Sequence, residues 1–145
     1  MEQIFKKDFL EELLAQAAES PRLRYNYDLR NSSLDTSQRM LNALQPHTEV
    51  PIHRHEKTAE TVICLVGKLE EIIYEEVSEY VHESTSCCDD VVRQKSFKEV
   101  SRKILSPAEG RFGIQIPAGA WHTINVIEPS VIFEAKDGAY RGYDR

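Results

Sequence analysis

The chain has 145 residues, with 24 acidic and 18 basic side chains and a formal net charge of −6. This length favours one domain that buries enough surface to fold without disulfides or a structural metal. The acidic balance argues against nucleic acid or an anionic membrane as a partner, and three cysteines are too few for a secreted disulfide framework. No apolar run approaches the roughly 18 residues of a spanning helix, and the N-terminus has no signal-peptide core. We therefore expect a cytoplasmic protein.

The acidic surplus is local. Residues 70–100 contain nine acidic and three basic side chains, so the whole charge of −6 falls there and the rest of the chain is balanced. The net charge therefore describes this segment and says little about a binding pocket elsewhere.

The first 37 residues predict a helix followed by an extended arm. Within residues 4–19, apolar side chains recur at helical spacing, at Phe5, Phe9, Leu13 and Ala17. Pro21 marks the end of this helix, and residues 22–35 have the polar and aromatic character of an extended arm with a turn.

From residue 38 to residue 145 the pattern changes to short apolar runs separated by turn residues. The runs are RMLNALQP, EVPIHRH, ETVICLVGKLEEIIYEE, FKEVSRKILS, RFGIQIP, WHTINVIE and SVIFEAK. Turn signals every 8–12 residues favour an antiparallel sandwich or barrel. Residues 78–96 are the least patterned stretch and are expected to form a long hairpin or loop.

Three of the five histidines stand in informative positions. His53 and His55 are one residue apart in an extended run, so their imidazoles share one face. Glu60 follows at the start of the next run, and His122 comes after a tight turn much further on. Three imidazoles and a carboxylate form a mixed nitrogen and oxygen set that suits a divalent transition metal. The pair His53 and His55 alone would more often be ordinary surface polarity.

The complete spacing resembles the two sequence motifs of the cupin superfamily over about residues 38–136. The matching residues are His53-x-His55, Glu60 and Gly67 for the first motif and Pro117-x-Gly119-x-x-His122 for the second. The resemblance implies a mainly β protein, a double-stranded β-helix (jelly-roll) barrel preceded by the helix. It also implies one divalent ion, Fe, Mn, Ni or Zn, held by His53, His55, Glu60 and His122. One departure is Val126, which stands where the second motif usually has an asparagine.

A narrower resemblance is to the WbuC-type cupin-fold metalloproteins, a family named from O-antigen polysaccharide gene clusters. It is carried by SPRLRYNYDL, by QRMLNALQP before PIHRH, and by FEAKDGAY. The family's reaction is not established, so the resemblance implies only a substrate class, a sugar or nucleotide-sugar of polysaccharide biosynthesis. Our leading hypothesis from the sequence is a metal-dependent enzyme, of isomerase or oxygenase type, that acts on such a small molecule. The alternative is a non-catalytic, metal-containing protein that binds or senses a carbohydrate or metabolite. A metal-free sugar-nucleotide epimerase ranks lower, since that type relies on a His/Tyr pair.

Several other polar residues are candidates for substrate contacts. They are Arg39, Asn42, Gln115, Glu134 and Lys136. Arg39 and Asn42 face opposite ways on a strand, so at most one of them points inward. Period two places Cys64 on the face of Glu60, although a buried structural thiol is the more common role. Arg54 should point away from the site.

The segment between the two motifs is long for a cupin, and we expect residues 77–97 to be an acidic insertion. It contains His82, Cys87 and Cys88, whose spacing does not support a second metal site and favours a solvated loop. Because cupins commonly pair through sheet edges, the resemblance also implies a homodimer.

Overall fold

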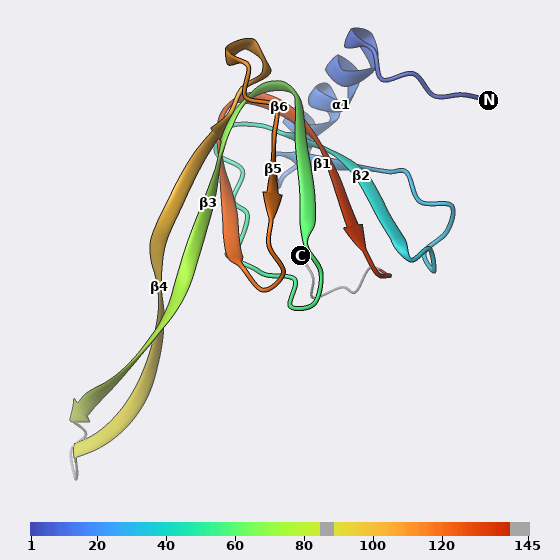
Figure 1. Ribbon diagram of the computed structural model, residues 1–145. Helices are drawn as coiled ribbons and strands as arrows, with labels where there is room; N and C mark the ends of the chain where they lie inside the picture. The colour runs from blue at the N-terminus through green and yellow to red at the C-terminus, as the bar shows by residue number, and fades with distance from the viewer. Residues whose placement is uncertain (85–88, 140–145) are drawn as a thin grey trace.

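The computed structural model describes residues 1–84 and 89–139 and consists mainly of antiparallel β-structure (Figure 1). Its elements in chain order are α1 (Lys7–Glu19), β1 (Arg24–Asp28), β2 (Ser37–Leu44), β3 (Glu60–Ser84), β4 (Asp89–Leu105), the 3₁₀ turn η1 (Pro107–Glu109), β5 (Gly113–Ile116) and β6 (Trp121–Asp137). Cys87 and Cys88 lie outside the described residues. The predicted extended arm is a regular strand, β1, which pairs with β2.

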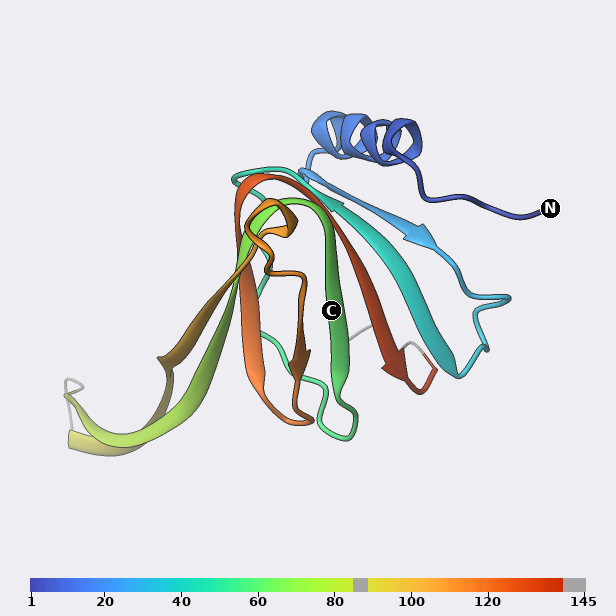
Figure 2. The same cartoon turned by 45° about the horizontal axis from the view of Figure 1, so that its top comes forward.

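Helix α1 forms where the apolar repeat predicts it and packs on the outside of the sheet (Figure 2). Leu13 and Ala17 are buried against Leu41 and Ala43 of β2 and Val131 of β6. Within the described residues, no helix is both long enough and apolar enough to cross a membrane.

The strands form one curled sheet in the order β1-β2-β6-β3-β4, with β5 paired to the start of β3. Long strands β3 and β6 bend, so each contributes to both sides of the barrel (Figures 1 and 2). The predicted break at Glu128-Pro129 is wrong, since β6 is continuous there. The pairing with β3 shifts register between Val66 and Lys68, and this irregularity accommodates the proline inside the strand.

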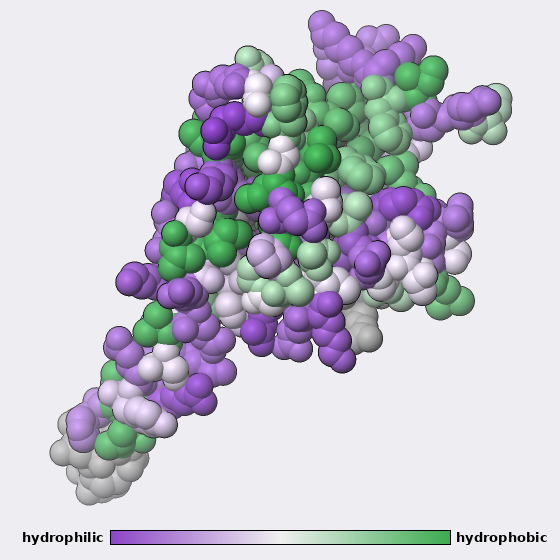
Figure 3. Space-filling view, viewed as in Figure 1, coloured by the Kyte–Doolittle hydropathy of each residue, from purple (hydrophilic) through white to green (hydrophobic). Residues whose placement is uncertain are grey.

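Residues 78–84 and 89–96, predicted to form a long hairpin or loop, form paired strands, which confirms the hairpin. They belong to β3 and β4, which pair without a further shift from Tyr74 and Glu99 to Ser84 and Asp89. The two strands form a ribbon, which we call the β3–β4 arm (residues 74–84 and 89–99), and it projects from the barrel (Figures 1 and 3). The described parts of the segment predicted as an insertion, 77–84 and 89–97, form most of this arm.

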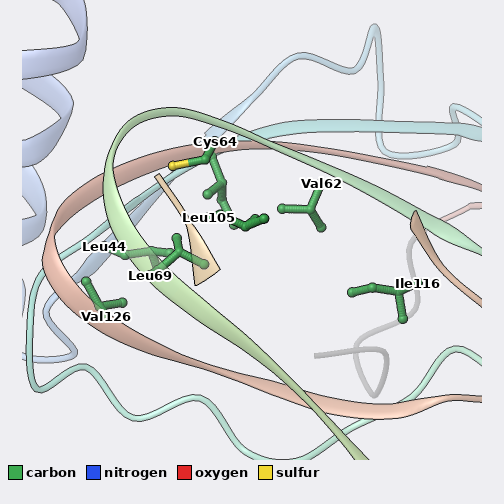
Figure 4. Packing of buried hydrophobic residues seen from close by; sticks show 8 residues of the cluster. Leu44, Val62, Cys64, Leu69, Leu105, Ile116 and Val126 are labelled. Atoms are coloured by element: carbon green, nitrogen blue, oxygen red, sulfur yellow. The ribbon is translucent and has the colours of Figure 1, made fainter. Parts of the chain in front are cut away.

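The run EVPIHRH was predicted to be a strand, and this is wrong. His53 makes only an isolated bridge, to His122, and the residues around it run extended without a ladder. The interior of the barrel is filled by apolar side chains from five strands (Figure 4). Strand β2 is buried on both faces, because Leu44 points into this core while Leu41 and Ala43 point to the helix.

Candidate metal centre

Two backbone pairings bring the histidines of distant segments together. His53 N–H donates to His122 O (3.0 Å) and His122 N–H donates to His53 O (2.8 Å), while Gly119 N–H donates to His55 O (2.8 Å). Gly119 adopts a positive φ of 82°, which the tight turn before His122 requires. The resulting ring centroids are 4.3 Å apart for His53 and His122 and 5.4 Å apart for His53 and His55.

Glu60 completes the cluster from the first position of β3. Its Oε2 lies 3.0 Å from His55 Nε2 and 3.3 Å from His122 Nε2. One ligand atom from each of His53, His55, Glu60 and His122 falls within 4.8 Å of the others. The structure therefore brings together all four residues that the cupin motifs single out, and three of them are buried.

Backbone carbonyls fix the orientation of two of the imidazoles. His53 Nδ1 lies 2.8 Å from Pro51 O, and His122 Nδ1 lies 2.9 Å from Ala120 O. A carbonyl oxygen only accepts, so each Nδ1 carries the proton and each neutral ring has its free lone pair on Nε2. This arrangement around histidine is typical of metal sites.

The electrostatics of the cluster are strongly coupled. Burial and the neighbouring His122 lower the pKa of His53 to about 4, which keeps that ring neutral. Burial also disfavours charge on Glu60, but the two imidazoles beside it outweigh this effect and hold the pKa of Glu60 below its usual range. For His122, burial is outweighed by the Glu60 carboxylate, so the pKa of His122 is raised.

The residues fit a divalent transition metal. Glu60 Oε2 is buried and makes no hydrogen bond within the described residues, although imidazole nitrogens surround it. Buried polar atoms are normally paired, and a cation is the group that satisfies a carboxylate and imidazole lone pairs at once. Three nitrogens and one oxygen suit such an ion and leave positions open on an octahedral metal. When bound, a metal of this kind supplies Lewis-acid or oxygen-activating chemistry.

The cluster forms part of the wall of a cavity that is partly open to solvent. Of the candidate substrate contacts, Asn42, Glu134 and Lys136 line this cavity. Arg39 does not, because it forms an ion pair with Asp35 (3.1 Å). Gln115 is exposed on β5, where its Oε1 accepts from Thr61 Oγ1 (2.6 Å).

The remaining candidate residues lie outside the cluster and its cavity. Cys64 is buried in the barrel core, and burial raises the pKa of its thiol to about 11. Arg54 points away from the cluster, pairs with Glu56 (2.9 Å) and covers the ring of Trp121 at 4.5 Å. His82 is exposed on the β3–β4 arm.

Gln38 and Glu71 are polar cavity residues that were not predicted. Gln38 shares the inward face of β2 with Asn42, so period two from Asn42 would have found it. Glu71 is harder to predict, because strand alternation from Glu60 places it on the outer face of β3. The register irregularities next to Gly67 change the alternation, and Glu71 then points inward.

Solved structures share this fold. A conserved protein of unknown function from Streptococcus pyogenes is 13% identical, with a TM-score of 0.59, and the match covers 97% of this chain and 93% of that chain. KdgF from a Halomonas species is 12% identical, with a TM-score of 0.51 and 85% of each chain covered. The capsular polysaccharide assembling protein CapF of Staphylococcus aureus is 16% identical, with a TM-score of 0.52, and the match covers 86% of this chain and 31% of that chain.

Fold and cluster together define a cupin-fold protein with a candidate metal centre, which confirms the fold class predicted from the motifs. Residues 5–85 match a protein family described as a domain of unknown function (DUF6016), and the chain belongs to that family. No curated protein matches the chain.

Proposed function

We propose that the protein is a metal-dependent cupin that acts on a small molecule in the cavity beside the cluster. One observation carries this proposal: His53, His55, Glu60 and His122 meet within 4.8 Å in the wall of a cavity. An ion there has protein ligands on one side and open space on the other. In this arrangement His53 and His122 bind the ion through Nε2, and Asn42, Glu134 and Lys136 contact the small molecule.

The sugar part of the proposal has separate support. The chain resembles the WbuC-type proteins, whose name comes from polysaccharide gene clusters, and one structural neighbour is called a capsular polysaccharide assembling protein. A sugar or nucleotide-sugar is therefore the substrate class that we propose, with Fe, Mn, Ni or Zn as the ion.

Metal content tests the proposal. Purified protein should contain about one divalent transition-metal ion per chain by elemental analysis, and His122→Ala should lose most of it because one of four ligands and its lone pair are gone. His82→Ala is the matched control, since His82 is exposed on the β3–β4 arm and is not one of the four residues of the cluster. Circular dichroism shows whether each variant stays folded.

Metal uptake and the coordination of the bound ion separate the outcomes. Protein that is isolated without metal and takes up none of the four ions would refute the metal centre. If the ion is bound in a closed tetrahedral shell without exchangeable water, the protein is a binder rather than an enzyme. Exchangeable water on the ion, seen by magnetic resonance of the Mn²⁺ form, is the result expected for an enzyme.

A further inference from the structure

Part of the cavity wall lies outside the four-residue cluster and is polar. Strand β2 contributes Gln38 and Asn42, and β3 contributes Glu71. All three side chains are more than nine-tenths buried, with exposed fractions of 7%, 1% and 2%. We call Gln38, Asn42 and Glu71 the polar wall.

Each residue of the polar wall has a buried atom without a hydrogen-bond partner within the described residues. These atoms are Gln38 Nε2, Asn42 Oδ1 and Glu71 Oε2. Leaving a buried donor or acceptor unpaired destabilises a fold, whereas apolar side chains of the same shape would not. Three such atoms around one cavity therefore point to a group that enters the cavity and pairs with them. Departures of this kind from good packing are expected at functional sites.

The chemistry of the three atoms is mixed. The amide nitrogen of Gln38 only donates, and the amide oxygen of Asn42 only accepts. Burial, with the nearby carboxylates of Glu60 and Glu134, raises the pKa of Glu71 and so favours its protonated form. A protonated carboxyl both donates and accepts.

A set of donors and acceptors is matched by hydroxyl groups, because each hydroxyl has one proton to donate and lone pairs to accept. An apolar ligand would leave all three atoms unpaired, and the acceptor oxygens of a carboxylate or phosphate could not pair with Asn42 Oδ1, which itself only accepts. From this we infer that the polar wall is a subsite that binds the hydroxyl groups of a polyhydroxylated small molecule. The inference rests on the proposed function for the identity of the cavity, but it concerns residues that are not metal ligands.

Binding is measured by saturation-transfer NMR titration with D-glucose, D-galactose, D-mannose and D-mannitol. The full chain is used both stripped of metal and loaded with Zn²⁺. We expect saturable binding of at least one of these polyols. 1,6-Hexanediol, which has the six-carbon chain of mannitol but only two hydroxyls, should bind at least about fivefold more weakly.

Two variants test the assignment to these residues. Asn42→Leu and Gln38→Met replace a polar side chain by an apolar one of similar shape, and each should weaken polyol binding at least about fivefold. Neither should cause a large loss of thermal stability, since each removes a buried polar atom that has no partner among the described residues. Asn125→Leu is the matched control, because Asn125 is exposed and its amide donates to Glu70 (2.8 Å) outside the cavity. This variant should bind polyols like the wild type.

The outcomes distinguish this inference from the proposed function. Metal uptake without binding of any of the four polyols would overturn the polar wall as a subsite and leave the metal centre standing, with water as the partner of the three atoms. Polyol binding without metal uptake would support the subsite and refute the metal centre. Equal polyol binding in wild type, Asn42→Leu and Gln38→Met would also overturn the inference, and so would a large loss of stability in both variants, because the amides would then have structural partners.

Discussion

At the scale of single residues, the same short-range arrangement occurs at two of the histidines. In each case the carbonyl two residues earlier, Pro51 O or Ala120 O, accepts from Nδ1. The local backbone thus sets the tautomer, and the isolated bridge between His53 and His122 sets the relative position of the rings. Orientation and tautomer are therefore fixed by the chain itself before any metal arrives.

Glu71 gives a prediction for the pH dependence of stability. Burial raises the pKa of Glu71 in the folded protein above that in the unfolded chain. The folded state then holds a proton that the unfolded state releases, so the free energy of unfolding of the wild type falls as the pH rises above the unfolded value near 4.5. Glu71→Gln cannot ionise, and we expect its stability relative to the wild type to increase as the pH rises above 4.5, until Glu71 also ionises in the folded protein.

Urea denaturation at several pH values measures this difference. Glu70→Gln serves as the control, because Glu70 lies on the outer face of the same strand and pairs with Arg102 (3.1 Å). A difference between wild type and Glu71→Gln that does not change with pH would contradict the prediction.

At the scale of elements, the irregularity beside Gly67 decides which side chains of β3 enter the cavity. Gly67 has a positive φ of 96°, and a Cβ there would collide with the backbone of Pro129 and the side chain of Ser130. Before this point Glu60, Val62 and Cys64 are buried, and after it Leu69 and Glu71 are buried. The close approach of β3 and β6 at Gly67 therefore shifts the alternation by one residue.

Gly67→Ala should destabilise the fold substantially. The positive φ costs about 1–2 kcal/mol for a residue with a Cβ, and the clash adds about 1–3 kcal/mol. Gly110→Ala is a matched control, since Gly110 has a φ of 75° but no atom within 4 Å of the added Cβ. We expect urea denaturation to show a larger loss for Gly67→Ala, and equal losses in the two variants would contradict the role of the close approach.

At the scale of the whole molecule, the β3–β4 arm needs an explanation of its own, because it projects from the barrel. A two-stranded ribbon is only marginally stable by itself in water, and this one exposes Tyr80, Val91 and Phe97, with 77% of Tyr80 accessible. Figure 3 shows hydrophobic residues along the arm among hydrophilic ones. A second copy of the chain is the partner that we propose for the arm, in line with the homodimer that the cupin resemblance implies.

Sedimentation tests this proposal. At micromolar concentration we expect the mass of two chains of 16.7 kDa each, and Tyr80→Lys should shift the mass toward one chain because it places a charge in the contact. Leu34→Lys is the control, as Leu34 is equally exposed but lies on the connection between β1 and β2. A wild type of one-chain mass would contradict the prediction.

Much of the fold and of the candidate site follows from local sequence patterns. Helix α1 comes from an i+4 repeat, and the four residues of the cluster come from motif spacing. The opposite directions of Asn42 and Arg39 follow from the alternation along one strand, whereas only the structure shows that Asn42 is the one that lines the cavity. Patterns of this kind depend on neighbours a few residues away, so they can be interpreted without knowledge of the rest of the chain.

What the sequence by itself determined is a mainly β protein with an N-terminal helix and the four residues of the cluster. Only the tertiary structure decided that Glu71 enters the cavity, that the chain passes Pro129 as one strand, and that residues 78–84 and 89–96 form a hairpin rather than a loop. The physical reason is the same in each case. Strand alternation and pairing after Gly67 are set by contacts with residues about 60 positions later in the chain, at Pro129 and Ser130, and by the register with β4.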